Sequence, residues 1–340
     1  MILIRHRKII KLGMLAIPIL VFAGSVSYIA SRFQWREVFT VLAKADLLKL
    51  VLVVSLVHFA YIVVRALRWR SAVRHAIPHL AFFDYYWITA VVVSLSTLTP
   101  GHSAEAFKIE LMKRRGLLGR LPGAGAFALE RLMDLAILSS MAAIGLVFGD
   151  FAARFAGWKA AAAVLAILAL LALCVLLFFD PGGRAALLLA QLRRGTSSKT
   201  WPQMAFLTIL SWVLVAVNWQ ISLSAVQIHL ALSQVLLLVS LVTIGAVLSF
   251  IPGGLGLSAV VTTAILTNMG IVAVTAQAGA VVLHAYGLIV VAFGLVHLGL
   301  WPIYGIYSDR YLAANKEYTE AATLVAPGQE PRSGSASQEF

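Results

Sequence analysis

The sequence predicts an all-α polytopic membrane protein, and three observations support this fold class. Of its 340 residues, 61% are hydrophobic and 12% are charged, whereas soluble domains carry about 25% charged residues. No Lys, Arg, Asp or Glu occurs from residue 200 to residue 308. Because roughly 20 apolar residues suffice for one transmembrane helix, this stretch must contain several helices. The apolar runs are continuous and do not alternate every second residue, which favours helices over a membrane β-barrel.

Nine apolar runs can be placed in the bilayer. They cover residues 12–30, 47–64, 83–99, 126–148, 159–179, 203–228, 235–251, 256–270 and 275–301. Proline removes a helix donor and glycine permits sharp turns. Residues 83–113 and 235–270 are therefore predicted to form broken or re-entrant hairpins that turn at Pro100-Gly101 and Pro252-Gly253. The other six runs cross the membrane fully. Counting one arm of each hairpin as a span gives about eight transmembrane helices.

The distribution of basic residues predicts the orientation of the chain. With the N-terminus in the cytoplasm, 20 Lys and Arg residues lie on the cytoplasmic side and six on the other side. Both termini are therefore expected in the cytoplasm, and the inner membrane of a bacterium is the expected location. The domain organisation is then a basic head (1–11), a single transmembrane domain (12–308) and a disordered polar tail (309–340). The formal charge of +13 fits loops that face anionic lipid, and no nucleic-acid partner is expected.

The two hairpins resemble each other in sequence. LSTLTPGHSAEAF in the first half can be aligned with LSFIPGGLGLSAV in the second half. The predicted layout lets the first hairpin enter from the cytoplasm and the second from the opposite side. Interrupted helices at corresponding positions of two inverted halves are typical of transporters with a binding site at the membrane midplane.

Ionisable residues are concentrated in the fourth apolar run. Glu130, Arg131 and Asp134 lie in AFALERLMDLAIL, at spacings that allow one helix to carry a local charge network. Such residues cost roughly 2.5 to 3.5 kcal/mol each at the centre of a span and therefore indicate function. The alternative is an interfacial cluster that reaches water and anchors the helix.

A second group of polar residues follows the first Pro-Gly break. A broken helix presents unpaired N–H groups and a positive dipole end, which together suit a phosphate. His102, Ser103 and Glu105 are expected at this position, and Lys108 lies one turn further. The alternative for this arm is a solvated amphipathic helix at the membrane interface.

A third group is RALRWR, in which Arg65 and Arg68 lie three residues apart on one helical face. The two guanidinium groups are positioned to bind a lipid phosphate in bidentate fashion. Anchoring of the span by basic residues is the alternative.

Other motifs do not indicate chemistry. The turn PGGLG lacks the Lys-Ser/Thr of a phosphate-binding loop and follows no strand. Cys174 has no partner for an intrachain disulfide, and single histidines such as His58 and His284 lack ligands at metal-binding spacing. We interpret these residues as packing residues, and we expect no metal and no cofactor.

The motifs occur in an order that resembles a known family. TPGHSAE precedes the basic arm, ERLMD follows, and IPGGLG lies far downstream. Over roughly residues 10–305 this order is similar to the flippase-like membrane domain at the N-terminal end of lysylphosphatidylglycerol synthases. The resemblance implies a first motif at Pro100, Glu105 and Lys108, a second at Glu130, Arg131 and Asp134, and a third at Pro252, Gly253, Gly254 and Gly256.

Two positions depart from the family pattern. Ala104 replaces a glycine that commonly precedes the first-motif glutamate, and Ala259 stands where the third motif commonly has a second glutamate. The second hairpin therefore lacks the carboxylate for a proton or counter-charge role. Only a polar tail follows Ser308, so we do not expect this chain to synthesise aminoacylated lipid.

The leading hypothesis is a lipid translocase for an amphiphile with an anionic head group. The expected partners are membrane lipids, either an anionic phospholipid or a lipid-linked sugar. The phosphate would be attracted by Arg65, Arg68, Lys108 and Arg131, with Glu130 and Asp134 balancing charge. One alternative is a membrane-embedded glycosyl or acyl transferase that uses Glu105 or Asp134. Another is an accessory subunit of a separate lipid-modifying enzyme.

Overall fold

The computed structural model describes residues 19–77, 80–115, 117–148, 200–249, 251–254, 256–306 and 308. Within these ranges the regular structure is helical, which confirms the predicted all-α class. The basic head, the apolar run at 159–179 and the tail from residue 309 lie outside the described residues. The chain divides into two compact units, Met1–Leu298 and Gly299–Phe340. Both helix breaks and the charged site described below lie in the first unit.

Four of the described helices are long and apolar enough to cross a membrane. The first combines the π-helix η1 (Lys49–Val53) with α3 (Val54–Val73). The others are α6 (Arg120–Phe148), α9 (Thr200–Ser224) and α12 (Ala273–Gly299). Each has at least 25 residues, and at 1.5 Å per residue this length exceeds the roughly 30 Å of a hydrocarbon core.

The remaining described helices are shorter. Ile19–Arg32 overlaps the first predicted span, and α2 (Trp35–Leu42) follows it. The helices α4 (Phe82–Ser96), α10 (Leu232–Leu248) and α11 (Leu257–Asn268) are apolar but have at most 17 residues. They belong to the two predicted hairpins, so their short length agrees with interrupted helices.

The first hairpin breaks at Pro100-Gly101. Thr99 is extended, and Gly101 and His102 both have a positive φ, of 57° and 55°. The Thr99 hydroxyl accepts a hydrogen bond from the Ala104 backbone N–H at 3.0 Å. It thereby satisfies one of the donors that the break exposes. The short 3-10 helix η2 (Pro100–Ala106) then leads into α5 (Phe107–Arg114), which packs back against α4.

The second hairpin breaks at Pro252-Gly253. Gly253, Gly254 and Gly256 have positive φ values of 61°, 59° and 80°, which glycine adopts without the steric cost of a Cβ. The turn η4 (Pro252–Gly254) leads into α11, and α11 packs back against α10. The two breaks meet in the fold, because residues of η2 and η4 have Cα atoms within 8 Å of each other.

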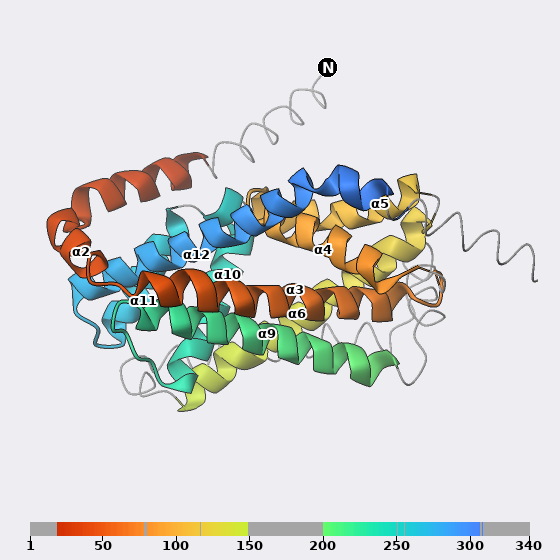
Figure 1. The fold of residues 1–340 in the computed structure, drawn as a ribbon. Coiled ribbons are helices and arrows are strands. Elements are labelled where there is room, and N and C mark those ends of the chain that lie inside the picture. Colours follow the sequence, from red (N-terminus) through yellow and green to blue (C-terminus); the bar gives the residue numbers. More distant parts are fainter. Residues whose placement is uncertain are drawn as a thin grey trace, which may run out of the picture. The chain divides into compact units, whose positions relative to one another are not determined.

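Close helix packing surrounds these breaks. The helices α3 and α9 run side by side (Figure 1), and α6 packs along α10. Gly145 of α6 permits this approach, since a Cβ there would lie 2.7 Å from the Leu237 Cβ of α10. Small residues at helix contacts are the usual device of membrane bundles.

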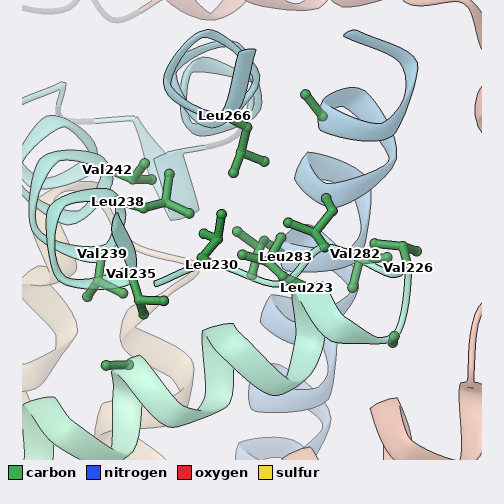
Figure 2. Close-up of a cluster of buried hydrophobic side chains, with 14 of the residues drawn as sticks. Leu223, Val226, Leu230, Val235, Leu238, Val239, Val242, Leu266, Val282 and Leu283 are labelled. Atoms are coloured by element: carbon green, nitrogen blue, oxygen red, sulfur yellow. The ribbon is translucent and has the colours of Figure 1, made fainter. Parts of the chain in front are cut away.

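A large apolar core lies between α9, α10, α11 and α12 (Figure 2). Its labelled side chains are Leu223, Val226, Leu230, Val235, Leu238, Val239, Val242, Leu266, Val282 and Leu283. This core includes residues of α10 and α11, which form the second hairpin, and all of its labelled residues are apolar.

Candidate functional site

Seven charged side chains from four helical elements come together inside the protein, and we call them the ionic cluster. They are Arg65 and Arg68 of α3, Glu105 of η2, Lys108 of α5, and Glu130, Arg131 and Asp134 of α6. All seven were predicted from sequence as candidate site residues, in three separate groups. Tertiary packing joins these groups into one network.

Asp134 is the most highly coordinated carboxylate of the ionic cluster. Arg68 donates from Nη1 to its Oδ1 at 2.6 Å and from Nη2 to its Oδ2 at 3.1 Å. Arg131 Nη2 lies 3.0 Å and Arg65 Nη1 3.4 Å from the same Oδ2. Three guanidinium groups therefore share one carboxylate, and the Arg68 pair has the bidentate geometry of strong ion pairs.

The two glutamates connect the remaining cations. Glu105 accepts from Arg65 Nη2 and from Arg131 Nη2, the latter at 2.8 Å. Glu130 accepts from Arg68 Nε at 3.1 Å and from Lys108 Nζ. Glu105 and Lys108 directly follow the first break, so the ionic cluster ties this break to α3 and α6.

Burial distinguishes Arg131 from the other members. Its side chain is 35% exposed, whereas the other six are at most 7% exposed. Its Nε makes no hydrogen bond with a described residue. Charges that merely anchored helices at an interface would reach water, and six of these seven do not. Arg131 is therefore the member through which the cluster can contact a ligand.

The charges of the ionic cluster do not cancel. Four cations face three carboxylates, which leaves a formal excess of one positive charge. Each of the four cations contacts at least one carboxylate, and Arg131 is the most exposed of them. The arrangement therefore suits one additional anionic group, and phosphate matches guanidinium donors in geometry.

Several uncharged residues complete the site, and sequence reasoning did not identify them. On α9, Trp212 Nε1 donates to Asp134 Oδ1 at 3.1 Å, and Arg68 Nη1 donates to the Thr208 hydroxyl at 3.3 Å. The Lys108 ammonium lies 4.0 Å from the centre of the Trp69 ring, a favourable cation–π distance. The spacing of Thr208 and Trp212 on one helical face was the available signal, but it is weak in an apolar helix.

The other residues predicted for the site are not members of the ionic cluster. His102 Nδ1 lies 3.3 Å from the Ser96 hydroxyl, and within the described part of the chain His102 makes no hydrogen bond to the ionic cluster. Ser103 is exposed, and no interaction joins it to the cluster among the described residues. Pro100 and Gly101 form the first break, and Pro252, Gly253, Gly254 and Gly256 form the second, which supplies backbone but no charge.

These features define a polytopic α-helical membrane protein with two broken helices and a buried ionic site. The sequence pattern of the lysylphosphatidylglycerol synthase TM region matches residues 15–294. The chain belongs to this family, which confirms the resemblance seen in the motifs and links the protein to lipid metabolism or translocation. A comparison with curated proteins found no match.

Proposed function

We propose that the protein is a lipid translocase that moves an amphiphile with an anionic head group between the leaflets of the membrane. The observation that carries this proposal is the buried ionic cluster with its excess positive charge. A phosphate bound beside Arg131 would neutralise that excess. The membrane family and the two broken helices support the proposal.

The position of the ionic cluster favours movement of a lipid over simple anchoring. Glu105 and Lys108 lie just after the first break, and that break contacts the second. A phosphate that binds the arginines competes with Glu105 for Arg65 and Arg131. Binding would thus weaken the ion pairs that hold Glu105 beside the first break. A ligand that changes these contacts can favour a different position of the broken helix, as alternating access requires.

The proposal includes an orientation. Both termini lie in the cytoplasm, in the inner membrane of a bacterium, because this placement puts 20 of the 27 basic residues on the cytoplasmic side. The head group is an anionic phospholipid or a lipid-linked sugar, and a separate lipid-modifying enzyme would supply or consume it.

The proposal is tested in liposomes that contain the purified protein and a fluorescent phosphatidylglycerol. A membrane-impermeant quencher measures how fast the labelled lipid moves between leaflets. We expect exchange with the wild-type protein and its loss in Arg68→Gln, because Arg68 is buried and joins two carboxylates. Arg114→Gln is the matched control, since this arginine is 72% exposed and bonded to Glu110, and it should retain exchange.

Two results would contradict the proposal. One is the lack of exchange for every anionic phospholipid and polyprenyl phosphate tested with the folded wild-type protein. The other is full exchange in Glu105→Ala and Arg131→Ala variants, because an accessory subunit tolerates both changes and a translocase does not.

A further inference from the structure

A second polar group lies on α3, toward the N-terminal end of the helix from the ionic cluster. His58 is 1% exposed, and neither of its ring nitrogens has a hydrogen-bond partner among the described residues. Three aromatic rings surround it: the centres of Phe293, Tyr61 and Tyr286 lie 5.1, 5.7 and 6.3 Å from the imidazole centre. A buried imidazole normally uses both nitrogens, so His58 requires an explanation beyond packing.

The facing helix α9 contributes polar atoms of the same kind. Asn218 is fully buried and interacts with the Tyr286 hydroxyl, but neither of its amide atoms reaches hydrogen-bond geometry with a described residue. Ser222, one turn further along α9, is also fully buried, and its hydroxyl has no partner there. His58 and Asn218, from two helices, thus both lie beside Tyr286, His58 near its ring and Asn218 near its hydroxyl.

Unpaired polar atoms in a membrane interior point to a polar ligand. Burying a polar group without a hydrogen bond is costly, and water in the hydrocarbon region cannot offset this cost. The group consists of an imidazole, an amide and hydroxyls, so it offers both hydrogen-bond donors and acceptors. It carries no formal charge when the imidazole is neutral. Aromatic rings and neutral donors and acceptors together suit hydroxyl groups on a carbon skeleton.

Tyr61 connects this group to the ionic cluster. Its ring centre is 5.9 Å from Arg65 Cζ and 5.7 Å from the His58 ring. His58 and Arg65 are seven residues apart on one helix, which corresponds to about 10 Å along the axis. This separation allows one head group to place its phosphate at the arginines and its hydroxyl-bearing part at His58.

We propose that His58 and Asn218 form a subsite for the hydroxyl groups of a glycerol or sugar head group. The subsite rests on the proposed function, since the ionic cluster holds the phosphate of the same lipid. It determines which anionic lipid is preferred, whereas the ionic cluster determines whether an anionic lipid binds.

The test compares lipids that differ only in hydroxyl groups. Phosphatidylglycerol and phosphatidylpropanol have the same phosphodiester charge, but the second lacks the head-group hydroxyls. Their binding to the full chain in nanodiscs of neutral lipid is measured by competition. We expect wild-type protein to bind phosphatidylglycerol or phosphatidylinositol about tenfold more tightly than phosphatidylpropanol, the factor expected for the net contribution of about one hydrogen bond.

The variants assign this preference to the subsite. His58→Phe and Asn218→Leu should each bring the affinity ratio close to one while the phosphatidylpropanol affinity is retained, which also shows that each variant is folded. His229→Phe is the matched control, because His229 is exposed, and it should keep the wild-type ratio.

Each outcome has a separate meaning. Equal affinity of wild-type protein for the three lipids overturns the subsite, and so does a preference that survives in both variants. Failure of wild-type protein to bind any anionic lipid overturns the proposed function instead.

Discussion

Replacing Asp134 by asparagine keeps the size of the side chain and removes the charge that three guanidinium groups share. In the native protein Arg68, Arg131 and Arg65 lie 2.6, 3.0 and 3.4 Å from its oxygens. The change raises the formal excess of the ionic cluster from one to two positive charges. It also places an amide N–H₂ against groups that are all donors. Breaking a buried ion pair in this way costs about 3–5 kcal/mol.

The free energy of unfolding is measured for the purified protein in detergent micelles, by titration with a denaturing detergent. A loss of about 3–5 kcal/mol increases the unfolding equilibrium constant by about 10²- to 10⁴-fold. Glu110→Gln is the control, because Glu110 also bonds two arginines, Arg114 and Arg120, but at the exposed surface. If the two variants unfold alike, the ionic cluster is solvated and our account of its energetics is wrong.

Three further predictions concern helix packing and the ionic cluster. Gly145→Ala should lower the free energy of unfolding by about 1–3 kcal/mol, because the new methyl group overlaps α10. Gly245→Ala has open space around it and should not be destabilising, so equal losses would contradict the packing. Lys108→Met and Glu130→Gln should be non-additive by about 0.5–3 kcal/mol in a double-mutant cycle, and additive values would show that the pair does not interact. Glu105→Gln should raise the affinity for phosphatidylglycerol in nanodiscs, since it removes a competing carboxylate; unchanged affinity would argue against this competition.

The helical class and the two breaks could be predicted from sequence because they depend on local chemistry. Long apolar runs require helices in lipid, and a Pro-Gly pair at the end of an apolar run favours a break of the helix there. The structure shows left-handed backbone at Gly101 and Gly253, as these pairs predict. His102 also has a positive φ, which sequence did not predict because this conformation is uncommon in residues other than glycine.

The assembly of the ionic cluster could not be predicted, because it depends on contacts across the fold. Sequence spacing gave the pairing of Arg131 with Asp134 within one helix. It could not show that Arg65 and Arg131 meet the same Glu105, or that Trp212 of an uncharged helix donates to Asp134. The inverted relation of the hairpins and the orientation of the chain stay predictions, since they refer to a membrane.

Glu105 links the chemistry of the ionic cluster to the geometry of the broken helix. It lies three residues after His102, whose backbone is left-handed, and it pairs with Arg65 and Arg131 from two other helices. An anion that takes over either arginine leaves Glu105 with fewer partners in a buried position, which is unfavourable. The break can relieve this cost only by moving Glu105 toward another donor or toward water. Under the proposed function, binding of an anionic head group is therefore coupled to rearrangement of the first hairpin, and the size of that coupling would set how strongly a bound lipid favours a rearranged hairpin over the one described here.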